Sequence, residues 1–246
     1  MVVESQRPQY RVWLSTASSR MKELSLYDIL GVLAPGAVVT VGIITLFPEA
    51  AAVLANKNFT VGEFGVVLLV SYVVGNLVAG LGNFLERAYW RMRGGDPTDC
   101  AIKKDGTLIH PREHQALQEK LQAKQLIRTD EHLADLHPRD WKGITRRMYL
   151  ELETRKATRR IELFNAQYGM NRGIAAGFIV LVALVAFHAG LAAWRIELML
   201  AVCTALACYR MERFSRYYTG ELLRGYLTAG EASRPQEPAG DKTTTA

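Results

Sequence analysis

The chain has 246 residues, of which 49% are hydrophobic and 22% are charged, and its formal net charge is +6. These averages resemble those of a soluble globular protein, but the apolar residues are concentrated in four blocks and the charges lie between them. The segmentation indicates an all-α integral membrane protein with four transmembrane helices arranged as two hairpins around a cytoplasmic helical insert. Because the cations lie beside the apolar blocks, the positive charge requires no acidic partner.

The cysteines and the N-terminal residues indicate whether the chain has disulfides and a signal peptide. The three cysteines are odd in number and lack a CxxC spacing, which excludes a disulfide scaffold and indicates reduced thiols. The first apolar block follows about 25 mostly polar residues and no small-residue cleavage site precedes it. We therefore expect no signal peptide and membrane insertion through retained segments.

The first hairpin is expected over residues 26–86, after a polar cytoplasmic segment at residues 1–24. Its spans are predicted at about residues 26–47 and 64–86, and Ser25 with Asp28 has the form of a capping box at the start. A proline two turns inside the first span predicts a kink near residues 33–36. The candidates there for helix packing or a hinge are Gly31, Pro35 and Gly36.

The second span carries small and amide side chains at steps of three and four residues, so we expect them on one face of the helix. In lipid, such a face has to meet another helix or water. Two interpretations remain open: packing within the monomer, or an oligomer seam or pore lining between subunits. The residues concerned are Tyr72, Gly75, Asn76, Ala79, Gly82 and Asn83.

A cytoplasmic helical domain is predicted at residues 87–171. A first helix is expected over residues 111–127. A second helix is expected from Pro138 through Tyr168 into the third span, with a slip of its periodicity near residues 153–156 and a bend at Gly169.

The second hairpin is predicted at residues 172–210, with spans at about residues 173–189 and 195–210. Gly173 and Gly177 form a GxxxG pattern that permits close approach of a neighbouring helix. An interfacial amphipathic helix is expected at residues 211–229 and a disordered tail at residues 230–246.

The cations set the predicted orientation. The two short outer connections carry only Lys57 and Arg195, so both termini and the middle segment are expected on the cytoplasmic side of an inner membrane. We expect the basic residues near the span ends to contact anionic lipid, and we do not expect nucleic acid as a partner. These residues are Arg155, Lys156, Arg159, Arg160, Arg210, Arg213 and Arg216.

Catalytic, cofactor and metal sites find no support in the sequence. His110 and His114 are four residues apart, but Pro111 lies between them and no paired cysteine or HExxH motif accompanies them. Solvated histidines explain the pattern, and His188 is expected near the outer interface. The apolar blocks contain no nucleophile with a base beside it. We expect a protein without enzymatic activity.

Two stretches, Ser25–Gly36 (SLYDILGVLAPG) and Arg160–Arg172 (RIELFNAQYGMNR), resemble uncharacterised bacterial membrane proteins built as a hairpin, a cytoplasmic insert and a second hairpin. Some proteins of that build occur in antiphage defence systems. The resemblance implies a bacterial inner-membrane effector. Together with the polar face of the second span, it leads us to expect an oligomeric, channel-like protein that alters membrane permeability in response to a cytoplasmic protein or signal ligand. The alternative is a non-conducting membrane anchor that recruits a cytoplasmic partner.

Overall fold

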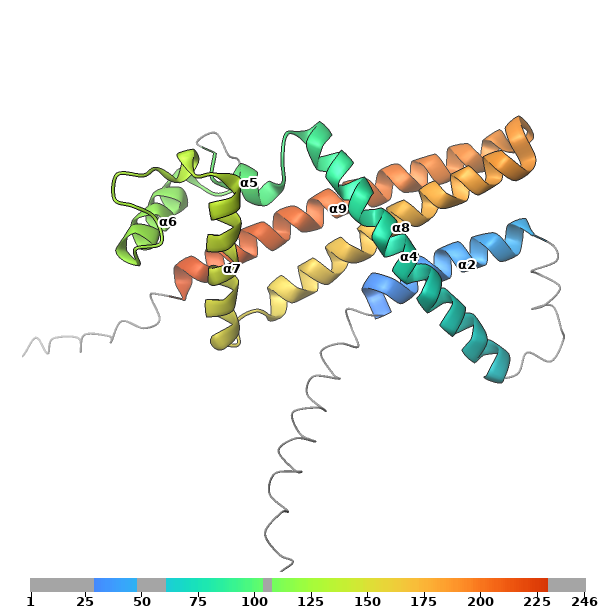
Figure 1. The fold of residues 1–246 in the computed structure, drawn as a ribbon, viewed down its shortest axis with the longest axis horizontal. Coiled ribbons are helices and arrows are strands. Elements are labelled where there is room, and N and C mark those ends of the chain that lie inside the picture. Colours follow the sequence, from blue (N-terminus) through green and yellow to red (C-terminus); the bar gives the residue numbers. More distant parts are fainter. Residues whose placement is uncertain (1–28, 48–60, 104–107, 230–246) are drawn as a thin grey trace, which may run out of the picture. The chain divides into compact units, whose positions relative to one another are not determined.

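A computed structural model of the chain describes residues 29–47, 61–103 and 108–229. The predicted N-terminal segment, the capping box and the C-terminal tail lie outside these ranges. Within them every regular element is a helix and no strand occurs, which confirms the all-α class (Figure 1). The elements are η1 (Ile29–Leu33), α2 (Ala34–Leu46), α4 (Val61–Arg93), α5 (Pro97–Ala101), α6 (Pro111–Ala123), η2 (Leu133–Asp135), α7 (Pro138–Thr154), α8 (Arg159–Ala189), η3 (Gly190–Ala193) and α9 (Trp194–Thr228).

The chain divides into two compact units. Unit 1 consists of the described residues up to Gly94 together with Phe164–Phe214, and unit 2 consists of Gly95–Leu163 together with the described residues from Ser215. Helices α8 and α9 therefore contribute to both units, with their apolar halves in unit 1.

In unit 1, the contacts define the direction of each helix. Gly173 and Gly177 of α8 approach Pro35 and Val39, so α2 runs parallel to α8. Trp90 and Gly82 of α4 meet successively later residues of α8, Tyr168 and Arg172, so α4 runs antiparallel to α8. The rings of Phe164 and Phe214 and the cluster of Leu181, Val185 and Leu200 pair α8 with α9 in antiparallel fashion (Figure 1). Direction thus alternates along the chain from α2 to α9.

Within the described ranges, two helices have the length and composition needed to cross a membrane. They are the stretch Val61–Ala101, which contains α4, and α8. Only 17% of the apolar window in the first and 33% in the second is buried within the chain, whereas the central helix of a soluble protein would be mostly buried. The spans predicted at residues 64–86 and 173–189 fall within these helices. The other two predicted spans fall in α2, which has 13 residues, and in α9, which does not pass the same test.

Unit 2 surrounds a core of its own. Trp141, Leu117 and Leu133 are fully buried, and the Trp141 indole donates a hydrogen bond of 2.8 Å to the Thr98 carbonyl. The last turns of α9 belong to this core, because Leu222, Leu223 and Tyr226 are each 1% exposed. The interfacial amphipathic helix predicted at residues 211–229 corresponds to the C-terminal part of α9.

The predicted continuous helix from Pro138 into the third span is wrong. Helix α7 ends at Thr154 and α8 begins at Arg159. Lys156 adopts a left-handed conformation (φ 56°), and the amides of Lys156 and Ala157 donate to the carbonyls of Glu153 and Leu152. This is a Schellman ending with lysine in the position that glycine usually occupies. Beyond it, α8 continues without interruption through Gly169.

The first described residues form a π-helical turn, Ile29–Leu33, and regular α-helix follows from Ala34. The change of helix type therefore occurs one residue before Pro35. Proline provides no amide hydrogen and its ring crowds the preceding turn, which is the physical cause of such a change.

Candidate functional site

Helix α4 contacts several helices of unit 1 and has two sides with different surroundings, a packed face and an exposed edge. One face is buried against α2 and α8 and consists mainly of small residues: Ser71, Gly75, Val78 and Gly82. At the crossing with α2 the two backbones touch. A Cβ placed on Gly75 would lie 2.1 Å from the Val32 carbonyl oxygen, and one placed on Gly36 would lie 1.8 Å from the Ser71 carbonyl oxygen. Only glycine fits on either side of this contact.

Helix α8 packs by the same principle. A Cβ on Gly173 would lie 2.7 Å from the Pro35 ring, and one on Gly177 would lie 2.9 Å from Val39. Val39 and Val78 are 2% and 3% exposed and form a small apolar cluster with Ala176. The three helices therefore meet over a surface with few protruding side chains. The GxxxG pair of α8 lies in this contact.

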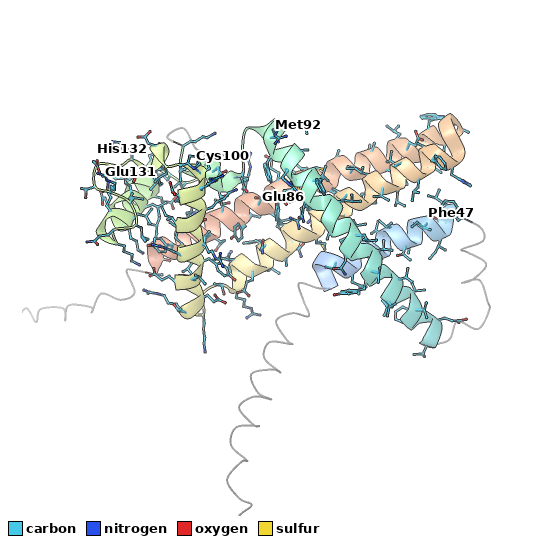
Figure 2. The ribbon with its side chains drawn as sticks, viewed as in Figure 1. Phe47, Glu86, Met92, Cys100, Glu131 and His132 are labelled. Carbon is cyan, nitrogen blue, oxygen red and sulfur yellow. The ribbon has the colours of Figure 1, made fainter. Side chains whose placement is uncertain are left out.

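Polar contacts connect the C-terminal part of α4 with α8 and α9. Glu86, labelled in Figure 2, accepts a hydrogen bond of 2.5 Å from Arg172 of α8. The Glu212 carboxylate of α9 is 9% exposed and lies 2.5 Å from Arg93 and 2.6 Å from the Tyr89 hydroxyl. The charges are thus paired at one end of the apolar segment of α4, as low-polarity surroundings require.

The other edge of α4 is exposed in the single chain. Tyr72 is 48% exposed, and Asn76 and Asn83 are exposed as well. The Asn76 amide donates 2.9 Å to the Tyr72 carbonyl of its own helix, and no hydrogen bond from the Asn83 side chain occurs within the described residues. Large apolar side chains flank this edge, with Leu69 67% and Leu77 68% exposed.

The structure therefore divides the residues that the sequence placed on one face. Gly75 and Gly82 lie in the packed face, Ala79 is half-buried between the two, and the tyrosine and both asparagines remain on the exposed edge. Ser71 and Val78, which complete the packed face, were missed. The signal for Ser71 was its four-residue spacing from Gly75, a small-xxx-small pattern.

The basic residues predicted to contact lipid also divide. Arg155 pairs with Glu151 at 3.2 Å and binds the Ala229 carbonyl, and Arg160 pairs with Glu221 at 3.2 Å. The Arg210 guanidinium lies 5.6 Å from the centre of the Phe214 ring. The remaining members of the set, which are exposed, are Lys156, Arg159, Arg213 and Arg216.

The histidines of unit 2 form hydrogen bonds that stabilise local structure. The rings of His110 and His137 accept hydrogen bonds of 3.3 Å from the amides of Arg112 and Arg139, which makes them the N-caps of α6 and α7. His114 lies 3.1 Å from the Ile102 carbonyl oxygen. Among the described residues no group of histidine, cysteine and acidic side chains is arranged to hold a metal ion.

Two lysines of unit 2, Lys120 and Lys124, contact the C-terminal end of α9. The Lys120 ammonium donates to the Tyr226 and Leu227 carbonyls, the latter at 3.0 Å, where the helix leaves its last carbonyls without backbone partners. Lys124 lies 5.0 Å from the centre of the Tyr226 ring and pairs with Glu151 at 2.6 Å. This hydrogen bond lowers the pKa of Glu151 below its ordinary value of 4.5.

Comparison of the chain with protein-family models, with curated proteins and with solved structures gave no match.

Proposed function

We propose that the chain is a multi-pass protein of a bacterial inner membrane, with η1–α2, α4, α8 and α9 as four spans and both termini cytoplasmic. The alternating helix directions of unit 1 support this arrangement. So do the apolar side chains that α4, α8 and α9 expose, among them Phe187 at 94% and Val202 at 52%. In water such a surface would cause aggregation, whereas in a bilayer it contacts acyl chains.

We further propose that α4 helices of several copies associate through the exposed edge. The observation that carries this proposal is the pair of exposed amides, Asn76 and Asn83, within an apolar helix. An amide that faces lipid keeps unpaired polar atoms at considerable free-energy cost, and a neighbouring helix that offers the same amides removes the cost. Interhelical hydrogen bonds of this kind contribute roughly 0.6–2 kcal/mol each.

The spacing of the edge suits such a contact. Its residues recur at alternating steps of three and four, the pattern of a left-handed helix pair, with both asparagines in equivalent positions. We call this set the α4 seam: Leu69, Tyr72, Asn76, Ala79 and Asn83. It ends before Glu86, whose carboxylate is engaged by Arg172.

In this proposal the oligomer is channel-like: a ring of α4 helices surrounds a path lined by amides, and its opening alters membrane permeability. Unit 2 receives the cytoplasmic signal, since it holds the last turn of α9 through Lys120 and Arg155. A protein or small ligand that displaced these cations would free one end of a helix that continues unbroken to Trp194.

The alternative is a non-conducting anchor. The separate core of unit 2 around Trp141 favours it, because a compact cytoplasmic unit on apolar helices suffices to recruit a partner to a membrane.

The experiment compares three full-length proteins: wild type, Asn76→Leu with Asn83→Leu, and the control Val73→Leu with Gly80→Leu. The control pair has the same spacing on α4, and both of its positions are exposed beside the seam. Chemical crosslinking reports the oligomer and a voltage-sensitive dye reports permeability after induced expression. We expect wild type and control to crosslink and depolarise the cells and the asparagine variant to do neither.

Each other result changes the conclusion. Equal crosslinking of all three proteins would remove the seam from assembly. Wild-type crosslinking without depolarisation, at verified expression and with the cytoplasmic partner present, would favour the anchor. Recovery of wild type in the soluble fraction would refute membrane insertion.

A further inference from the structure

Helix α7 has a buried face and a strongly basic one. Its apolar residues Trp141, Ile144, Met148 and Leu152 lie in the core of unit 2, none more than 6% exposed. The opposite face carries four exposed cations: Arg139, Lys142, Arg146 and Arg147. With 100° per residue, these four and Gly143 cover an arc of about 140° on the solvent side of the helix.

The charges of this face are not neutralised by the protein. Within the described part of the chain none of the four cations forms a salt bridge, whereas Arg155 and Arg160, farther along, do. Lys142 has a weaker electrostatic interaction with Asp99. The acidic residues of the face lie toward its ends, Asp140 in the first turn and Glu153 in the last.

We propose that this basic face docks on the anionic phospholipid headgroups of the membrane that holds α4 and α8. Phosphate-bearing lipids complement an array of guanidinium and ammonium groups in charge and hydrogen bonding. Each basic side chain beside an anionic leaflet multiplies the docked population roughly fivefold, so four act together strongly.

Chain connectivity favours lipid over other polyanions. Helix α8 begins five residues after the end of α7, and its apolar part starts at Gly173, about 21 Å farther along the helix. The membrane surface is therefore the polyanion at the highest local concentration. The face also has no aromatic side chain on which a base could stack, a contact that single-stranded nucleic acid ordinarily uses. Its exposed apolar residue is Leu150, which is 49% exposed.

This inference rests on the membrane insertion proposed above and is independent of conduction. It differs from the lipid contacts expected from the sequence, because the cations on α7 are not among the residues predicted there. Docking would hold α7 against the membrane, together with the contacts that Lys120 and Arg155 make with the end of α9.

The test places a fluorophore in the middle of the face. A Cβ at Gly143 has no neighbour within 4 Å, so Gly143→Cys labelled with an environment-sensitive dye is tolerated. Cys100→Ser, Cys203→Ala and Cys208→Ala leave this as the single thiol. The full-length protein is reconstituted in nanodiscs of phosphatidylcholine alone or with about one third phosphatidylglycerol, and acrylamide quenching is measured. Charge variants are Arg146→Glu with Arg147→Glu, and the control Arg112→Glu with Arg128→Glu at exposed sites outside α7.

We expect acrylamide quenching to fall at least threefold in the anionic discs and to recover at high salt. We expect the α7 variant to lose this response and the control to keep it. Equal quenching in both discs, or an unchanged response of the α7 variant, would overturn the inference. A dye response to a DNA or RNA duplex in neutral discs, without one to anionic lipid, would overturn it in favour of nucleic acid. Failure to enter discs at all would instead refute the proposed function on which it rests.

Discussion

The contact between α2 and α4 makes a quantitative prediction for Gly75→Ala. The new methyl group would lie 2.1 Å from the Val32 carbonyl oxygen, and an ordinary contact begins at 3.4 Å, so the helices must separate by about 1.3 Å. No rotamer change relieves this, because the obstacle is backbone. The movement would also open the cluster of Val39, Val78 and Ala176. Overpacking ordinarily costs 1–3 kcal/mol, and we expect about 3 kcal/mol here.

The matched control is Gly80→Ala on the same helix. A Cβ at this position has no neighbour within 4 Å. Both substitutions add the same methyl group and the same gain in helix propensity, up to about 1 kcal/mol, so their difference isolates the clash. The free energy of unfolding is measured by titrating sodium dodecyl sulfate into the protein in mild detergent and following tryptophan fluorescence. If the two variants differ by less than about 1 kcal/mol, the backbones of α2 and α4 do not touch.

Three further predictions concern the polar contacts. Arg172→Met should destabilise unit 1 by about 1–3 kcal/mol in the same titration, because it leaves the Glu86 carboxylate without its partner. Adding Glu86→Leu should recover part of this loss. If the losses of stability of the two single variants simply add in the double variant, the residues do not form a pair. His110→Ala should destabilise the protein by about 1 kcal/mol, and His110→Asn should destabilise it by much less, since asparagine also caps helices. Equal losses of stability in the two variants would refute the role of His110 as a cap. The hydrogen bond from Lys124 lowers the folded-state pKa of Glu151, so its stabilisation is present in full above the ordinary pKa of 4.5 and is lost as the pH falls through the folded-state value. Glu151→Gln should therefore lower the Tm at pH 7, and this drop should shrink as the pH is lowered through the acid range; a drop of constant size would contradict the linkage.

Composition and spacing sufficed for the all-α class of the described residues and for the two long apolar helices that contain residues 64–86 and 173–189. They could not predict which of the small and amide residues of α4 are packed against α2 and α8 and which are exposed. Gly75 and Asn76 are adjacent and so point about 100° apart, which means that a single partner helix cannot cover both. Which of them faces α2 depends on where Gly36 and Pro35 place the other backbone, and periodicity carries no such information.

The break between α7 and α8 was hidden for a related reason. A Schellman ending ordinarily announces itself with glycine, and here Lys156 takes the left-handed position. The weakened periodicity near residues 153–156 was the trace of this break. For the end of α9 the sequence indicated only an interfacial helix, because periodicity shows that one face is apolar and not what covers it. Leu222, Leu223 and Tyr226 lie in one buried cluster with residues of α6 and α7.

Symmetry sharpens the argument for the α4 seam. Copies of one membrane protein share one orientation, so α4 helices that meet around a symmetry axis are parallel, and equivalent residues lie at the same level along that axis. Asn76 then lies beside Asn76 and Asn83 beside Asn83, seven residues or about 10 Å away. An amide both donates and accepts, so it can pair with its own copy, as a charged side chain cannot. The packed face of α4 offers no such groups, because backbone contact with α2 already occupies it. If α4 associates with its own copies as proposed, the two self-complementary amides on this exposed edge would also set the register of the contact.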